Sequence, residues 1–460
     1  MHIIQVSTAD RLGGAERVAL SLHQRLRENN HDSRLCVGWK HTQTTAVDEL
    51  CPDRDNSYWK QCFINIALNF ERNSGKKWCR HTGRLARALG DPAEFLRWWR
   101  GLEEFHYGKT RQLLAPPYDH YALLHLHNLH GGYFDLRLLP ELCDKYNVII
   151  TMHDEWLYTG HCAYSMDCQR WQAECGQCPY PETYPAVRMD NTEANLDRKK
   201  KLYRESRLNI VTPSRWLMDR VKQSILADSI AESLVIPNGV DSGIFFPGDK
   251  IAARKKLGLE QDAYVLLFMA NYFRSNRFKD YETVLQAAIR AGEKTTGHRK
   301  IILVAVGEDT ALEHVDQIEL DVRPYIADQA MTACYFQAAD IYLHAAHSEI
   351  WGLTITEAMA TGVPVIATRT GGIPEQVNSL DTSELDERAQ QGTTTATGIL
   401  VGQKESAAMA DAICLLLENE QLRKQLGDNA TRHVNNHYTL EHMFSAYTDF
   451  YKNILGQQLQ

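Results

Sequence analysis

The chain has 460 residues, of which 44% are hydrophobic and 23% are charged, and its formal net charge is −8. This length exceeds one typical hydrophobic core and predicts two domains of roughly 200 residues each. The acidic balance argues against a dedicated nucleic-acid binder, which usually carries a basic excess. Eleven cysteines, an odd number, do not suggest a disulfide framework. The N-terminus reads as a strand rather than a leader, and no apolar run is long enough to span a membrane, so we expect a cytoplasmic protein.

The first half of the chain alternates short apolar runs with helical segments. This alternation predicts a parallel sheet covered by helices on both faces. Gly13 and Gly14 follow the first run and precede an amphipathic helix. Such a pair lets the backbone approach a phosphate or sugar closely, and a plain tight turn is the alternative. The expected strands are His2–Val6, Tyr121–Leu126, Val148–Met152, Asn209–Thr212 and Ser233–Ile236.

Residues 71–111 are basic and aromatic within an acidic protein. They contain ten Lys or Arg and five Asp or Glu, together with Lys76–Trp78, Phe95 and Arg97–Arg100. Basic residues interleaved with tryptophan suit a membrane surface, and they predict peripheral attachment at the inner face of a membrane. The alternative is a solvated pair of helices with its aromatic side chains in the core.

Histidines follow two of the expected strands. His127 comes after the second strand, and His153 with Asp154 comes after the third. Both positions are at carboxyl ends of strands, the edge at which parallel sheets bind ligands. We therefore expect His153 in a site, whereas His127 has the alternative of packing with Asn128.

A cysteine-rich insert occupies residues 160–180. Its cysteines have the spacing C-x5-C-x6-C-x2-C, which suggests a structural metal site, most simply zinc held by four thiolates. The alternatives are a disulfide or redox-sensitive pair, or unlinked cysteines. The four residues are Cys162, Cys168, Cys175 and Cys178.

The break between the two halves is expected near Ile236–Asp241, where Pro and Gly cluster between two strand-helix series. This position predicts an N-terminal domain over 1–241 and a C-terminal domain over 242–439. A last helix over 440–460 would pack back on the first domain. The strands expected in the second half are Tyr264–Met269, Lys300–Val306, Ile341–His344 and Val363–Ala367.

The segment 348–368 carries the strongest functional signal. It predicts a loop, a helix over 352–361 and a buried strand, with Glu349 before the helix and Glu357 inside it. Eight residues at helical rise separate the two carboxylates by roughly 12 Å. The amides of Gly352 and Leu353 at the helix N-terminus would attract an anion. The arrangement matches a sugar nucleotide, with its diphosphate between the two carboxylates.

This segment resembles the E-x7-E motif of family 4 glycosyltransferases, although Ile350 and Trp351 replace the usual glycine and phenylalanine. The resemblance implies an α/β GT-B fold of two Rossmann-like domains facing each other across a cleft. It also implies that Glu349 contacts the donor sugar and Glu357 the ribose hydroxyls. It covers nearly the whole chain but is strong only in the second domain.

The same resemblance implies roles for other parts of the chain. Gly13 and Gly14 match the family's glycine-rich loop, and His153 matches a histidine that reaches the donor sugar. The loop at 370–375 matches the one that follows the E-x7-E strand. A cysteine-rich insert occurs in a subset of similar bacterial polysaccharide transferases, so the insert is expected to accompany transfer rather than replace it.

The loop after the strand Tyr264–Met269 is expected to bind the donor diphosphate. The family places an arginine and a lysine here, and electrostatic stabilisation of the leaving group is the main aid to such a transfer. Lys279 matches the lysine, and Arg274 or Arg277 is the candidate arginine. Tyr325, ahead of a predicted helix, is a candidate to cover the base, with a plain surface aromatic as the alternative.

These features together predict a retaining transfer of a sugar from a nucleotide diphosphate to a glycan or lipid-linked acceptor in surface polysaccharide biosynthesis. No cofactor is expected for the reaction, because Asp53 and Asp55 spell D-x-D but follow no clear strand. One alternative is a non-catalytic nucleic-acid binder that uses the cysteine insert and the basic segment. Others are a sugar-nucleotide epimerase and a phosphorylase on the same fold.

Overall fold

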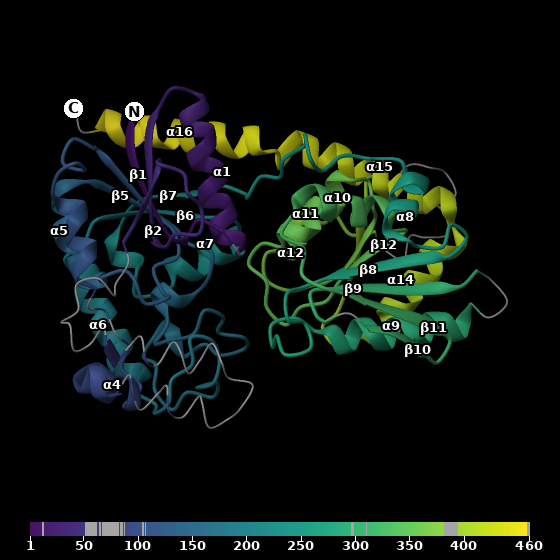
Figure 1. Ribbon diagram of the computed structural model, residues 1–460, viewed down its shortest axis with the longest axis horizontal. Coiled ribbons are helices and arrows are strands. Elements are labelled where there is room, and N and C mark those ends of the chain that lie inside the picture. The colour runs from purple at the N-terminus through teal and green to yellow at the C-terminus, as the bar shows by residue number, and fades with distance from the viewer. Residues whose placement is uncertain are drawn as a thin grey trace. The chain divides into compact units, whose positions relative to one another are not determined.

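A computed structural model describes residues 1–11, 13–50, 62–63, 66, 82, 86, 88–103, 105, 107–295, 299–309, 311–380 and 394–457. The chain forms two compact units (Figure 1). Unit 1 comprises Met1–Thr212, Met218–Val235 and Thr448–Gln460, and unit 2 comprises Pro213–Leu217 and Ile236–Tyr447. The sequence places the boundary after Asp241, whereas the main division falls after Val235. Asp53, Asp55 and Lys76–Trp78 lie outside the described residues.

Unit 1 is built on a seven-stranded sheet with the order β3-β2-β1-β4-β5-β6-β7, in which every pairing is parallel. The order reverses between β1 and β4, so the polar residues that follow these two strands lie near the switch point of the sheet. The strands are β1 (His2–Ala9), β2 (Asp32–Trp39), β3 (Val47–Glu49), β4 (Leu123–Leu126), β5 (Asn147–Thr151), β6 (Leu208–Thr212) and β7 (Ile230–Val235).

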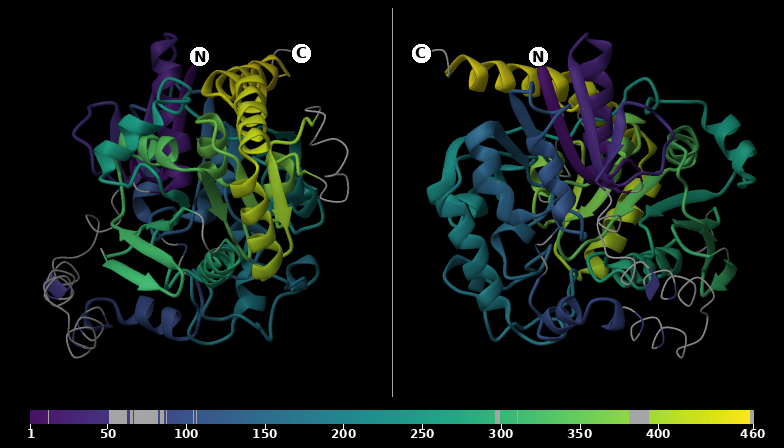
Figure 2. Two further views of the ribbon diagram at one scale, coloured as in Figure 1. Left: turned by 90° about the vertical axis from the view of Figure 1, so that its right-hand side faces the viewer. Right: turned by 60° about the vertical axis from the view of Figure 1, so that its left-hand side comes forward.

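The last helix of the chain ends in unit 1. His125 of β4 is fully buried and lies 2.7 Å from both the Tyr451 hydroxyl and the Thr151 hydroxyl, which ties the helix end to the sheet. The two termini lie on the same side of this unit (Figure 2). The helices that begin or end in unit 1 are α1 (Gly14–Glu28), α4 (Pro92–Trp99), α5 (Leu139–Lys145), α6 (Thr192–Arg204), α7 (Arg215–Lys222) and α16 (Leu440–Gln457).

Unit 2 contains a second seven-stranded sheet with the order β10-β11-β9-β8-β12-β13-β14. Among the strand pairs that the described residues form here, β10–β11 is antiparallel and the others are parallel, and the order reverses between β8 and β12. The strands are β8 (Tyr264–Met269), β9 (Ile301–Val306), β10 (Ala311–Val315), β11 (Ile318–Arg323), β12 (Ile341–His344), β13 (Val365–Thr368) and β14 (Gly398–Val401).

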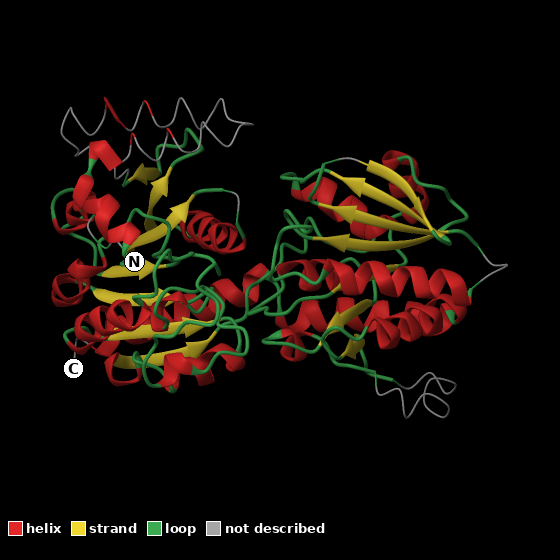
Figure 3. Ribbon diagram, turned by 90° about the horizontal axis from the view of Figure 1, so that it is seen from below, coloured by secondary structure: helices red, strands yellow, loops and turns green. Residues whose placement is uncertain are grey.

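Helices cover both faces of the unit 2 sheet (Figure 3). Along β8, Val265 and Leu267 join one hydrophobic core with α8, α10 and α11, whereas Leu266 and Phe268 join another with α9 and α14. Alternate side chains of a strand point to opposite faces, so a continuously apolar strand serves both cores. The helices are α8 (Lys250–Leu257), α9 (Tyr281–Lys294), α10 (Gln329–Ala338), α11 (Leu353–Ala360), α12 (Ile373–Gln376), α14 (Ser406–Glu418) and α15 (Glu420–His437).

The nine expected strands are all present, with ends shifted by a few residues. Five further strands were not expected, because their polar residues or short length hide the apolar pattern: β2, β3, β10, β11 and β14. Over the residues that the structure describes, no helix is both long and apolar enough to cross a membrane.

Candidate functional site

In unit 2, Lys279, Glu349 and His344 meet at the carboxyl ends of β8 and β12. The Lys279 ammonium forms an ion pair with the Glu349 carboxylate, and His344 Nε2 lies 3.2 Å from the same carboxylate oxygen. Glu349 is 8% exposed and His344 1%. The three groups therefore form a compact charged cluster at the point where the strand order reverses.

The electrostatics of the cluster keep Glu349 ionised. Burial alone would raise the pKa of this carboxyl, but the Lys279 charge and the His344 contact outweigh burial and lower the pKa to about 2. Burial and the same lysine charge lower the pKa of His344, so its imidazole is neutral at pH 7. Its Nδ1 lies 3.1 Å from the Tyr342 hydroxyl, which sets the orientation of the ring.

Backbone pairing holds Lys279 beside the segment after β12. The Asp280 amide donates to the Ala345 carbonyl at 3.0 Å, and the His347 amide donates to the Phe278 carbonyl at 2.9 Å. Asp280 also caps α9 by accepting from the Thr283 amide at 3.2 Å. The lysine thus precedes a fixed helix start, which limits where its side chain can reach.

A glycine turn supports Glu349 from its other side. The Gly372 amide donates to the Glu349 carbonyl at 3.0 Å. Gly371 has φ +55°, and a Cβ added there would lie 1.8 Å from the same carbonyl oxygen. A side chain at Gly371 would therefore push the Glu349 backbone out of place. This turn is the loop that the sequence analysis matched to the one following the E-x7-E strand.

The helix between the two glutamates forms as expected, although one feature of its start differs. Gly352 is the N-cap of α11 and Leu353 is its first residue. The Gly352 amide is not free for an anion, because it donates to Gln376 Oε1 at 2.9 Å, and Gln376 returns a hydrogen bond to the Gly352 carbonyl. Glu357 lies inside α11 and is 2% exposed.

The remaining candidates of unit 2 lie on exposed loops. Arg274 and Arg277 are both exposed in the loop that leads to Lys279, and the Arg274 amide donates to Glu308 at 3.0 Å. Tyr325 is 47% exposed and follows β11. The roles of these three residues stay predictions.

In unit 1, the glycine pair begins the first helix. Gly13 is the N-cap of α1 and Gly14 is its first residue. A Cβ on Gly13 would lie 1.9 Å from a carboxylate oxygen of Glu16, so glycine at this position leaves room for that side chain. Burial raises the pKa of Glu16, and the nearby Asp154 charge adds to the rise.

The histidines after β4 and β5 form two pairs. His127 Nδ1 lies 3.0 Å from His153 Nε2, with the two rings stacked. His130 Nε2 lies 2.6 Å from the Asp154 carboxylate, whose other oxygen accepts from the Trp156 amide. Burial alone would lower the pKa of His130, but Asp154 outweighs it and raises the pKa. His153 thus lies in the expected place, and its expected neighbour Asp154 bonds to a different histidine.

Sequence reasoning missed His344 and His130 as site residues. The rule that selected His127 and His153, a position at the carboxyl end of a parallel strand, also applies to these two residues. His344 ends such a strand and His130 follows one. The sequence alone does not indicate their partners. The ion pair of His130, for example, joins residues 24 positions apart and forms because β4 and β5 are neighbours in the sheet.

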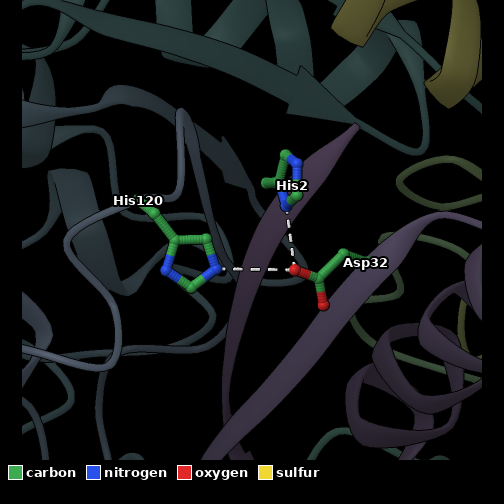
Figure 4. Close-up of side chains that lie close together, drawn as sticks. All are labelled: His2, Asp32 and His120. Carbon is green, nitrogen blue, oxygen red and sulfur yellow. Dashed lines mark hydrogen bonds and ion pairs between the residues drawn. The ribbon is translucent and has the colours of Figure 1, made fainter.

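The four cysteines of the insert line one pocket together with His161. All four are free thiols. Within the described part of the chain, the only His, Cys, Asp or Glu side chains that bring three ligand atoms within 4.8 Å of one another are His2, Asp32 and His120. Figure 4 shows both of these imidazoles directed at the Asp32 carboxylate. The predicted zinc site at the cysteines stays a prediction.

Known proteins match different parts of the chain. Residues 249–433 match the family model described as Glycosyl transferases group 1. The N-acetyl-alpha-D-glucosaminyl L-malate synthase of Bacillus anthracis is 29% identical over 47% of this chain and 53% of its own length. The chain spans about half the length of this and several other curated relatives that it matches.

Two longer matches extend over most of the chain. The Escherichia coli K12 protein described as "Putative colanic acid biosynthesis glycosyl transferase WcaC" is 24% identical over 82% of this chain and 85% of its own length. The structure of Anabaena HepE in complex with UDP-glucose is 13% identical, with a TM-score of 0.58 over 98% of this chain and 100% of that one. This likeness confirms the predicted α/β fold of two Rossmann-like units, the GT-B fold.

Proposed function

We propose that this chain, whose residues 249–433 match the family model described as Glycosyl transferases group 1 and whose fold is GT-B, transfers a sugar from a nucleotide diphosphate to an acceptor hydroxyl. The observation that carries the proposal is the cluster of Lys279, Glu349 and His344 at the switch point of unit 2. A cation beside an ionised carboxylate at this edge suits a diphosphate and the sugar attached to it.

In the proposed reaction the bond between the sugar C1 and the diphosphate oxygen breaks as the acceptor oxygen bonds to C1. Lys279, with Arg274 or Arg277, stabilises the charge that develops on the diphosphate. Glu349 contacts the donor sugar, and Glu357 binds the ribose. The acceptor proton passes to the departing diphosphate, and attack on the same face retains the configuration. The reaction needs no metal in this scheme.

The names of two similar proteins support a class of substrate. HepE binds UDP-glucose, and WcaC is named for colanic acid biosynthesis. These names support a UDP-sugar as the first donor to test and a glycan or lipid-linked oligosaccharide as the acceptor. We therefore propose a role in surface polysaccharide biosynthesis on the cytoplasmic side of a membrane.

The donor assignment predicts a ligand-specific change in thermal stability. One member of a panel of UDP-, GDP- and ADP-sugars is expected to raise the melting temperature of the protein. Glu357→Gln should weaken the affinity for that donor by about 10- to 100-fold, because it removes hydrogen bonds to a charged acceptor. Glu418→Gln, an exposed glutamate of α14, is the matched control and should leave the affinity unchanged. No shift with any sugar nucleotide, with or without an acceptor glycan, would contradict the proposal.

We also propose that unit 1 attaches to an anionic membrane surface through α4. This helix exposes Leu96 (50%), Trp98 (40%) and Trp99 (41%), and Arg188 lies over the Trp99 ring at 3.5 Å. Large apolar side chains beside arginine are suited to the interface of a bilayer.

The attachment predicts binding to vesicles of phosphatidylglycerol and phosphatidylcholine in a pelleting assay. A Leu96→Ser, Trp98→Ser variant should bind at least about tenfold more weakly, because aromatic and aliphatic area no longer leaves water. Trp39→Ser removes a similarly exposed tryptophan elsewhere in unit 1 and should have no effect. Equal binding of the two variants would contradict attachment through α4, as would binding that does not depend on anionic lipid.

A further inference from the structure

The cysteine loop, residues 160–185, has little of the structure that stabilises the rest of unit 1. Within it, the structure has one short 3-10 turn, Arg170–Gln172, and its fully buried apolar side chains are Ala163 and Trp171. Cys162, Cys168, Cys175 and Cys178 line one pocket of this loop. A segment with so small a core usually needs a covalent or metal crosslink to hold one conformation.

His161 shows how one of the four sulfur atoms is oriented. Its Nδ1 lies 2.7 Å from the Pro185 carbonyl oxygen, which can only accept, so Nδ1 carries the hydrogen. Nε2 therefore presents its lone pair to the Cys178 sulfur at 3.3 Å. The Cys178 thiol can therefore donate to His161, which fixes the direction of this sulfur in the pocket.

Hydrogen bonds anchor both ends of the pocket. The Cys178 amide donates to the Asp190 carboxylate, and the Thr159 hydroxyl donates to the Cys162 carbonyl at 2.6 Å. The Gly176 amide, between the last two cysteines, donates to the Thr192 hydroxyl at 2.9 Å. These bonds hold the backbone of the loop around the thiols, so that side-chain rotation is the main adjustment left for binding an ion.

Binding an ion would require the sulfurs of the four cysteines to approach one another. A tetrahedral zinc with sulfur ligands at about 2.3 Å separates neighbouring sulfurs by about 3.8 Å. No three ligand atoms at the cysteines are within 4.8 Å of one another. Rotation of a cysteine between staggered χ1 positions moves its sulfur by about 3 Å, which is the scale of the adjustment open to each thiol.

The other group that could hold an ion is less suited to zinc. His2, Asp32 and His120 are solvent-exposed, and the hydrogen bond of 2.8 Å from His2 Nδ1 to Asp32 accounts for their proximity (Figure 4). His2 and Asp32 begin β1 and β2, at the opposite edge of the sheet from the residues that follow β4 and β5. Thiolates bind zinc more strongly than a single exposed carboxylate with two imidazoles.

We propose that the cysteine loop binds one structural zinc ion through the thiolates of Cys162, Cys168, Cys175 and Cys178. The Ala163 amide donates to the Tyr184 carbonyl, and the Tyr184 ring lies 5.5 Å from His130. The ion would therefore stabilise the surroundings of the His130–Asp154 pair. The proposal does not depend on sugar transfer.

The test measures bound metal in the full chain, purified under reducing conditions without chelator. We expect about one zinc per chain by elemental analysis. After exchange for cobalt(II), sulfur-to-cobalt charge-transfer absorption should appear in the near ultraviolet. Cys175→Ser, Cys178→Ser should abolish both signals. Cys414→Ser, a half-buried cysteine of α14, and His2→Ala, His120→Ala should retain the metal.

Three results would overturn the proposal. The first is wild-type protein with neither zinc nor thiolate-cobalt absorption after reconstitution. The second is loss of the metal in His2→Ala, His120→Ala but not in the cysteine variant, which would assign the ion to the site of Figure 4. The third is a disulfide between Cys175 and Cys178 in reduced, metal-supplemented protein, seen by mass spectrometry.

Discussion

Replacing Lys279 with methionine is expected to lower kcat for sugar transfer by about 10²- to 10³-fold. Removing one preorganised group that stabilises developing charge typically has an effect of this size. The substitution keeps an unbranched side chain, although one that is an atom shorter, and deletes its charge beside the buried Glu349. The measurement is steady-state transfer with the donor identified by thermal shift. Lys294→Met removes the charge from an exposed ion pair with Asp411 and is the matched control, with an expected change of less than twofold.

The same cluster predicts how stability depends on pH. The pKa of Glu349 falls from 4.5 to about 2 in the folded protein, so this group stabilises the fold fully above pH 4.5 and progressively less as pH falls toward 2. In that window its contribution should decrease by about 1.4 kcal/mol per pH unit. The measurement is urea unfolding of wild type and of Glu349→Gln at several pH values from about 2.5 to about 6, which span this window. It gives the difference in the free energy of unfolding between the two proteins at each pH. A parallel pH dependence of the two proteins would contradict the assignment, as would wild-type kcat in Lys279→Met.

Below pH 6.5, Asp154→Asn is expected to destabilise unit 1 by up to about 3–5 kcal/mol, because it removes the counter-charge of the buried, protonated His130. Hydrogen exchange of the segments 123–130 and 147–156 measures this loss within unit 1. A local measurement is needed because a protein of two units need not unfold in a single step. Asp32→Asn breaks the same kind of pair with His2 at the surface, where both side chains are about half exposed, and should cost less than about 1 kcal/mol.

His130 and Asp154 make the stability of unit 1 depend on pH in opposite directions. The raised pKa of His130 gives stability that is present below pH 6.5 and lost as pH rises through the raised value. The lowered pKa of Asp154, with His130 outweighing burial, gives stability that is present above pH 3.8 and lost as pH falls through the lowered value. The exchange difference between wild type and Asp154→Asn should therefore be greatest between these limits. Equal losses in the Asp154 and Asp32 variants would show that His130 and Asp154 are not a buried ion pair.

Much of the fold and part of the site could be predicted because the relevant signals are local. Apolar runs of strand length, separated by helices, identified nine strands and the α/β class. The spacing of Glu349 and Glu357 placed a helix between them, and the observed α11 runs over Leu353–Ala360. The glycine pair at Gly13 and Gly14 lies at a helix start for the same reason, since a strand-turn-helix unit is encoded within about 30 residues.

The contacts that were missed join residues far apart in the chain. Glu349 bonds to a lysine 70 residues away, and the Gly352 amide is taken by Gln376, 24 residues further on. Neither contact leaves a periodic pattern, because each depends on which strands are neighbours and on how the loops after them turn. For this reason the Gly352 amide at the start of α11 was expected to bind an anion, whereas in the folded protein it donates to Gln376.

The sequence by itself determined the α/β class, most strands and the candidate residues, because side-chain polarity and short-range spacing decide local structure and the burial of each strand. Only the tertiary structure decided the partners: His344 and Lys279 on Glu349, His130 on Asp154, and His161 on Cys178. Each of these contacts has a favourable energy only once parallel strands or loops have brought the groups together and removed water from them. The charge states of these groups and their pairing therefore depend on the fold, whereas the residues that take part can be identified from the sequence.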